Sequence, residues 1–196
     1  MQNPNPLAKN TFLVKEHIGL LKAANDYDVY DPETGAIVLH CREEALGPLT
    51  RLLRFSSYKR MTPFDVRIRT PDGRLIVQVR RGVSFLRSRV EVVDGTGVIG
   101  RFRQKVFSLG GAFDVLDAAE NVICTLKGKW TGWDFRFIVG ERELAHVSKK
   151  WAGIGQELFT SADNYVLSIS EAVGADDPAR KLILAAVMCI DMVLKE

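Results

Sequence analysis

The sequence predicts a mainly β (α+β) protein: a closed antiparallel barrel of about twelve strands around a central hydrophobic C-terminal helix. Two observations predict this fold. Short stretches of alternating apolar and polar residues recur in pairs, joined by turns rich in Gly, Asp and Pro. The chain then ends in a segment with nine consecutive apolar residues. Its 196 residues, 46% of them hydrophobic, suffice for one domain with a substantial core.

The alternating stretches form five predicted hairpins with one further strand at each end. The first strands of the hairpins begin alike, as in Phe64–Arg67 and Phe113–Leu116, which indicates a weakly repeated hairpin unit. The predicted strands are 11–16, 27–31, 36–42, 64–69, 74–80, 89–93, 98–103, 113–116, 122–126, 133–139, 143–149 and 164–170. We expect residues 1–10, which are polar and contain two prolines, to form a flexible tail before a single domain over residues 11–196.

The last element is a helix predicted over residues 178–195. Asp177 is suited to cap its first free N–H groups, and Pro178 suits the first helical position. Every residue from Leu182 to Ile190 is apolar, so the run covers all faces of the helix and has to be buried on all sides. Spanning a bilayer takes about 20 apolar residues, and this run is shorter. The helix residues expected in the barrel core are Leu182, Leu184, Val187 and Ile190.

A closed barrel accounts for both features, because closure removes the sheet edges and lets the inward face of every strand pack on the helix. The alternative is a sandwich with the helix over one end, which leaves part of the helix surface unexplained. One stretch departs from the β pattern. Residues 48–55 place Leu49, Leu52 and Leu53 on one helical face and two arginines on another. This predicts a short helix that caps one mouth of the barrel or contacts a membrane surface.

No motif in the sequence indicates bond-making catalysis, and we expect that the protein is not an enzyme. The three histidines, His17, His40 and His146, are not at metal-ligand spacing, and the chain has no nucleophile elbow, P-loop or Rossmann fingerprint. The stretch Asp94–Gly97 is a hairpin turn and not a phosphate loop. Three scattered cysteines argue against a disulfide framework or a zinc site and fit a reducing compartment.

Positive charge is concentrated in the middle of the chain. Residues 51–105 carry fourteen Lys or Arg and four Asp or Glu, although the formal net charge of the protein is +3. Strand alternation directs the apolar residues of this region inward, among them Leu75 and Val98, and the arginines outward. The arginines expected on this basic face are Arg67, Arg69, Arg74, Arg80, Arg89, Arg101 and Arg103. They are either a phosphate-binding surface or a solvated barrel exterior.

The partners that suit such a face are anionic phospholipids at a membrane surface. The alternative is a soluble regulatory module that contacts nucleic acid or an acidic protein. Single-stranded nucleic acid is less favoured, because few aromatic residues accompany the arginines for base stacking. The polar N-terminus lacks the apolar run of a secretory signal, so we expect a cytoplasmic protein that acts peripherally at the membrane.

The C-terminal third resembles a known family. The order of Gly128–Phe135, Leu144–Trp151, Glu157–Phe159 and Ala162–Tyr165, followed by the apolar helix, is similar to that of phospholipid scramblases, within the wider group of tubby-like and LURP-one-related barrels. The likeness is strong from Trp130 to Glu196 and extends more loosely to Tyr27. It implies a twelve-stranded barrel around a hydrophobic helix, lipid translocation between leaflets, phosphoinositide binding in the tubby branch and calcium dependence in eukaryotic members.

The sequence departs from the calcium-responsive members of that family in the segment before the last strand. Those members begin this segment with Asp-Ala-Asp-Asn, whereas here Ser161 replaces the first acid. The calcium ligands implied by the resemblance are Asp163 and Asn164, which fall short of the several oxygen ligands that calcium requires. We therefore expect at most weak calcium binding and no other cofactor. The cysteine cluster and proline-rich N-terminus of some eukaryotic relatives are also absent.

Overall fold

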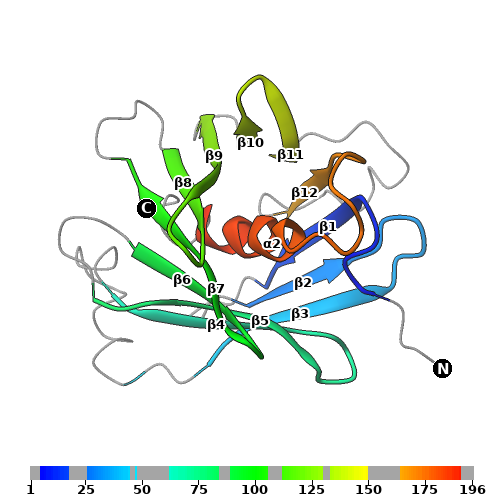
Figure 1. The fold of residues 1–196 in the computed structure, drawn as a ribbon. Helices are drawn as coiled ribbons and strands as arrows, with labels where there is room; N and C mark the ends of the chain where they lie inside the picture. The colour runs from blue at the N-terminus through cyan, green and yellow to red at the C-terminus, as the bar shows by residue number, and fades with distance from the viewer. Residues whose placement is uncertain are drawn as a thin grey trace.

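The structure is a computed structural model that describes residues 5–17, 26–44, 47, 62–83, 89–105, 112–129, 133–149 and 164–190. Twelve antiparallel strands close into a barrel in the order β1-β12-β11-β10-β9-β8-β7-β6-β5-β4-β3-β2. Their bounds are β1 (Thr11–Glu16), β2 (Tyr27–Tyr30), β3 (Ile37–Glu43), β4 (Phe64–Arg69), β5 (Leu75–Arg81), β6 (Arg89–Asp94), β7 (Gly97–Gln104), β8 (Ala112–Asp117), β9 (Val122–Lys129), β10 (Asp134–Val139), β11 (Arg142–Ser148) and β12 (Asn164–Ile169). Helix α2 (Ala179–Cys189) lies inside this ring, which confirms the predicted barrel and excludes the sandwich (Figure 1).

Helix α2 is the centre of the core. Every residue from Leu182 to Ile190 is at most 4% exposed, as a helix that is apolar on all faces requires. The predicted helix over 178–195 is described from Ala179 to Cys189, and residues 191–196 lie outside the described residues. Among the described residues, no helix combines the length and the apolar character that crossing a bilayer demands.

The start of α2 follows the predicted signals. The Asp177 side chain accepts a hydrogen bond from the backbone N–H of Ala179 at 2.8 Å, and Pro178 already has helical backbone angles. One N–H that the helix itself leaves free is thereby satisfied.

Each of the five hairpins contains a β-bulge in its second strand, close to the turn. At each bulge one residue is skipped by the pairing, and each skipped residue is an aliphatic side chain that packs against the core. The five bulge residues are Val38, Ile76, Ile99, Ile123 and Leu144. The weak hairpin repeat in the sequence is therefore a repeat in structure as well.

The bulges correct two sequence assignments. Simple alternation predicts that Leu75 and Val98 point inward with the other apolar residues of their strands. Because a bulge shifts the register by one residue, Ile76 and Ile99 pack against the core instead, Leu75 is 39% exposed and Val98 is half-buried. Away from the turns the alternation holds, and Val66, Ile68, Val77, Val79, Val90, Val92 and Phe102 are all buried.

The helix packs closely against the barrel wall at Gly100 of β7. A Cβ atom added there would lie 2.7 Å from a methyl carbon of Leu182 and 2.5 Å from the carbonyl oxygen of Leu116. A larger residue would therefore have to displace the helix or the strand, since real Cβ atoms do not come that close.

Part of the expected N-terminal tail is held against the barrel. Leu7 is 5% exposed and belongs to the core, and the carbonyl oxygen of Asn10 accepts a hydrogen bond from the N–H of Ile169 at 2.7 Å. Residues 5–10 therefore include direct contacts with the barrel. The short helix predicted over residues 48–55 lies outside the described residues.

Candidate functional site

The arginine face covers the outside of four adjacent strands. Its members are Arg67 and Arg69 on β4, Arg74 in the turn after β4, Arg80 on β5, Arg89 on β6, and Arg101 and Arg103 on β7. Five of these side chains are 35–58% exposed and Arg101 is 17% exposed. The strands neighbour one another in the sheet, so the structure brings together the arginines that the sequence predicts on one face.

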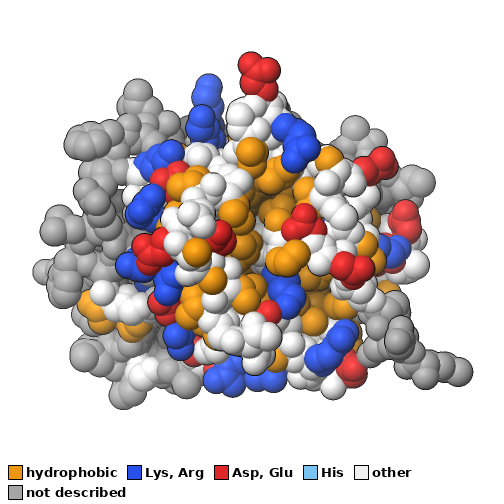
Figure 2. Space-filling view, viewed as in Figure 1, with side chains coloured by type: hydrophobic (Ala, Val, Ile, Leu, Met, Phe, Trp, Pro, Cys, Tyr) orange, Lys and Arg blue, Asp and Glu red, His pale blue; other side chains and the backbone are white. Residues whose placement is uncertain are grey.

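Six of these seven arginines, all but Arg74, form ion pairs with carboxylates of the described residues, and each carboxylate is shared by two cations. Glu44 contacts Arg67 and Arg69, Glu91 contacts Arg80 and Arg101, Glu120 contacts Arg89 and Arg101, and Asp114 contacts Arg103 and Lys105. Among the described residues, these ion pairs thus join seven cations, Lys105 included, to four carboxylates, an excess of three positive charges. Figure 2 shows acidic and basic side chains intermixed on the side of the molecule that it displays.

Sequence reasoning missed most of this pairing. Glu44, Asp114 and Glu120 lie outside residues 51–105, so the charge count over that stretch does not include them. Strand register reveals part of it, because Glu91 is directly opposite both Arg80 and Arg101. Glu44 and Glu120 come from connections between strands, where register gives no guidance.

Between β3 and β4 and between β6 and β7, like charges face each other directly across neighbouring strands. Arg89 on β6 is opposite Arg103 on β7, and Arg42 on β3 is opposite Arg67 on β4. Opposed like charges destabilise a sheet, and here each of the four arginines contacts a carboxylate that compensates its charge. The barrel wall therefore tolerates closely spaced arginines where carboxylates form ion pairs with them.

A second polar cluster surrounds Asp28 on β2. This carboxylate, in a residue that is 4% exposed, contacts His40 at 2.7 Å, Arg42 at 2.5 Å and His17 at 2.6 Å. Burial favours the neutral acid, but the hydrogen bonds from these three side chains outweigh it and lower the pKa of Asp28. Because Arg42 occupies the same carboxylate, the cluster is a buried ion-pair network.

The remaining metal candidates do not assemble into a centre. His146 contacts Asp134 at 3.0 Å on the barrel exterior. In the part of the chain that the structure describes, no three His, Cys, Asp or Glu side chains are placed to hold a metal ion. Of the two calcium candidates, Asn164 is buried at the start of β12 and Asp163 lies outside the described residues.

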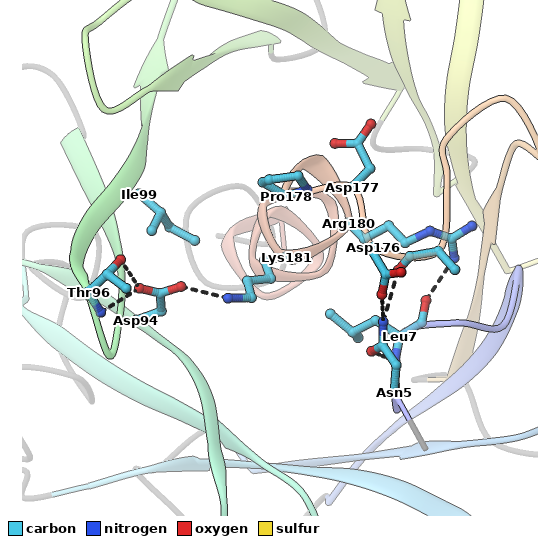
Figure 3. Close-up of a pocket in the computed structure, with 11 residues that line it drawn as sticks. Asn5, Leu7, Asp94, Thr96, Ile99, Asp176, Asp177, Pro178, Arg180 and Lys181 are labelled. Carbon is cyan, nitrogen blue, oxygen red and sulfur yellow. Dashed lines mark hydrogen bonds and ion pairs between the residues drawn. The ribbon is translucent and has the colours of Figure 1, made fainter. Parts of the chain in front are cut away.

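A pocket of about 380 Å³ opens at the barrel mouth where α2 begins. Figure 3 shows it between the β6–β7 turn, the first turn of α2 and the N-terminal segment. Lys181 of the helix contacts Asp94 at the end of β6 at 2.6 Å, and the Thr96 hydroxyl donates to the same carboxylate at 2.7 Å. Leu7, Ile99 and Pro178 contribute apolar wall. The Asp94–Lys181 pair anchors the first turn of the helix to the barrel wall.

The Asp94–Lys181 pair gives the protein a defined acid sensitivity. Burial opposes ionisation of Asp94, but hydrogen bonds from Lys181 and Thr96 lower its pKa to about 2. A carboxyl whose pKa is lower in the folded state stabilises the fold above its unfolded pKa, and this stabilisation disappears as the pH falls toward 2. We expect Asp94→Asn to reduce the free energy of unfolding by about 2 kcal/mol at pH 7 and by almost nothing near pH 2.

Urea denaturation of the two proteins from pH 7 to pH 2 measures this difference. Glu141→Gln, which removes an exposed acid from another hairpin turn, is the control and should stay within about 0.5 kcal/mol of the parent. A gap between Asp94→Asn and the parent that does not change with pH would contradict the assignment.

Comparisons with known proteins agree with the architecture. The family model described as Scramblase matches residues 9–196. Among solved structures, an X-ray structure of a protein from Arabidopsis thaliana is similar, with a TM-score of 0.55 and 11% sequence identity; the match covers 98% of this chain and 94% of the plant chain. At that identity the likeness concerns the fold. A search among curated proteins finds no significant match. Because the family model spans the barrel from before β1 to the end of the chain, the protein belongs to the scramblase family.

Proposed function

We propose that this scramblase-family barrel binds anionic phospholipid headgroups, phosphoinositides included, at a membrane surface. The observation that carries the proposal is the charge of the arginine face, where seven cations share four carboxylates. Phosphate groups at an anionic surface supply the negative charge that this face lacks. Arginine suits that role because its planar guanidinium makes paired hydrogen bonds to phosphate oxygens.

The carboxylates do not prevent phosphate from binding. Exposed ion pairs contribute only about 0–1 kcal/mol each, so an arginine exchanges or shares its carboxylate at little cost. The shared carboxylates also hold the long side chains close to the wall, which reduces the entropy lost on binding.

The proposal concerns headgroup binding and includes no bond chemistry. Since α2 fills the barrel and is covered on every face, its insertion into a bilayer would require the barrel to open. Translocation of lipid between leaflets is for that reason not part of the proposal. The alternative, a soluble regulatory module for nucleic acid or an acidic protein, would use the same arginines.

The test removes four exposed cations of the face and measures binding to vesicles. We expect Arg67→Gln, Arg69→Gln, Arg80→Gln and Arg103→Gln together to weaken binding to phosphatidylserine-containing vesicles by more than tenfold. Each Lys or Arg near an anionic membrane contributes about 1 kcal/mol, and tenfold corresponds to about 1.4 kcal/mol. Binding of the parent should also fall as salt is added, because the Debye length shrinks to about 3 Å at 1 M.

The control removes three cations elsewhere on the surface, Lys9→Gln, Lys15→Gln and Arg142→Gln, and should bind almost normally. Thermal melts confirm that both variants fold. Undiminished vesicle binding by the folded arginine variant would contradict the proposal. A gel shift with generic DNA that is lost in the same variant, without vesicle binding by the parent, would favour the soluble module.

A further inference from the structure

The charges of the barrel are distributed unevenly along its axis. Neighbouring strands are antiparallel, so the five hairpin turns and the β12–α2 connection all leave the barrel at one end, here termed the hairpin end. These six connections, residues 31–36, 70–74, 95–96, 118–121, 140–141 and 170–178, contain a single cation, Arg74. The same residues contain eight acids: Asp31, Glu33, Asp72, Glu120, Glu141, Glu171, Asp176 and Asp177.

Exposed cations gather where strands terminate at the opposite end, here termed the loop end. They are Arg80 near the end of β5, Arg103 and Lys105 at the end of β7, and Lys127 and Lys129 at the end of β9. Adjacent strands are about 4.8 Å apart, so this arc from β5 to β9 extends over roughly 20 Å. That spread suits an extended anionic surface better than a single small anion.

The three lysines at this end, Lys105, Lys127 and Lys129, extend the arginine face onto β9. Lys105 and Lys127 lie on either side of Ala112: the N–H of Lys105 bonds to the carbonyl oxygen of Ala112 at 2.9 Å, and Ala112 is directly opposite Lys127. Lys105 contacts Asp114 at 2.8 Å. Among the described residues, Lys127 and Lys129 have no ion-pair partner.

Lys127 is moreover directly opposite Arg136 of β10. Both side chains are exposed and point away from the core, in which Leu126 and Phe135 are buried. Opposed like charges destabilise a sheet, and in contrast to the pairs on β3–β4 and β6–β7, only Arg136 has carboxylate partners here. An external anion would relieve this repulsion.

We infer that the barrel docks end-on, with the loop-end cations of β5, β7 and β9 against an anionic bilayer and the acidic hairpin end pointing away from it. Lys127 and Lys129 are then headgroup-binding residues in addition to the arginine face. This inference rests on the proposed membrane binding and adds its orientation. Repulsion between the bilayer and the hairpin-end acids disfavours the opposite orientation.

The first experiment compares two double variants that lose the same charge at opposite ends of the barrel. Lys127→Gln with Lys129→Gln removes the loop-end lysines of β9. Lys9→Gln with Arg142→Gln removes two cations at the hairpin end that do not belong to the arginine face: Lys9 contacts Asp31 and Glu33 beside the β2–β3 turn, and Arg142 is exposed at the start of β11. With vesicles of equal parts phosphatidylcholine and phosphatidylserine, we expect the Lys127/Lys129 variant to bind at least about tenfold more weakly and the Lys9/Arg142 variant to bind like the parent.

The second experiment reads the orientation directly. Val83, after β5 at the loop end, and Val122, after the β8–β9 turn at the hairpin end, are 61% and 52% exposed. The native Cys41, Cys124 and Cys189 are buried, and burial raises the pKa of their thiols, to about 12 for Cys41 and for Cys124. A fluorophore attached to Val83→Cys or Val122→Cys therefore reports on one end alone.

Quenching by nitroxide-labelled lipid is expected for the label at position 83 and not for the label at position 122. Equal quenching at both positions, stronger quenching at position 122, or equal losses of binding in the two double variants would overturn the end-on orientation while the proposed function stands. Absence of vesicle binding by the parent protein would overturn both.

Discussion

Replacement of Arg180 by Met is expected to reduce the free energy of unfolding by about 3–5 kcal/mol, a large part of the roughly 5–15 kcal/mol that holds a domain together. Arg180 is in the first turn of α2 and is 2% exposed. Its guanidinium donates six hydrogen bonds of 2.6–3.2 Å to the carbonyl oxygens of Leu7, Lys9, Val173 and Gly174 and to the Asn10 side chain. Met fills similar space but leaves these acceptors unsatisfied.

Urea denaturation of Arg180→Met measures the loss, and Arg142→Met, at an exposed position of β11, is the control expected within about 0.5 kcal/mol of the parent. Arg180→Lys should fall between them, because an ammonium group supplies three donors. Since Arg180 joins the N-terminal segment to the helix, trypsin should also cleave after Lys9 faster in the Met variant. An unchanged melting transition together with unchanged cleavage would refute this role of Arg180.

Introducing a charge into the middle of α2 should have a larger effect still. Ala185 is 0% exposed inside the barrel, so Ala185→Glu buries a carboxylate without a partner in the described core. The penalty of several kcal/mol, added to the overpacking by a longer side chain, approaches the whole stability of the domain. We expect no cooperative unfolding transition for Ala185→Glu by circular dichroism.

Ala172→Glu, in the exposed β12–α2 connection, makes the same chemical change outside the core and should melt like the parent. Truncation after Asp176 provides an independent check, because it removes the entire helix. A cooperative melt for either Ala185→Glu or the truncated chain would mean that the barrel is stable without α2 at its centre.

The arrangement of the strands is largely a local property of the sequence. All twelve predicted strands are present, and their bounds differ from prediction by at most a few residues. Period-two alternation and turn residues such as Gly73 and Gly140, both with positive φ, act within a few residues of each other. The all-apolar run of α2 is equally evident in the sequence, because a helix with no polar face has to be buried on every side.

The β-bulges are a feature that these local sequence patterns did not predict. Alternation predicts Leu75 in the core, but a single skipped residue at Ile76 exchanges the two faces of the strand beside the turn. The sequence contains no separate signal for that skip, since Leu75 and Ile76 are both suitable core residues. Closure of the barrel around the helix decides which of them faces inward.

The sequence by itself therefore determined the twelve strands, the central helix and the side of the wall on which the arginines lie. Only the tertiary structure decided what those side chains contact. Glu44 and Glu120 reach the arginine face from distant connections, and Arg180 binds an N-terminal segment about 170 residues away in the chain. Such contacts join segments that are far apart in the sequence, and the local alternation of apolar and polar residues does not indicate them.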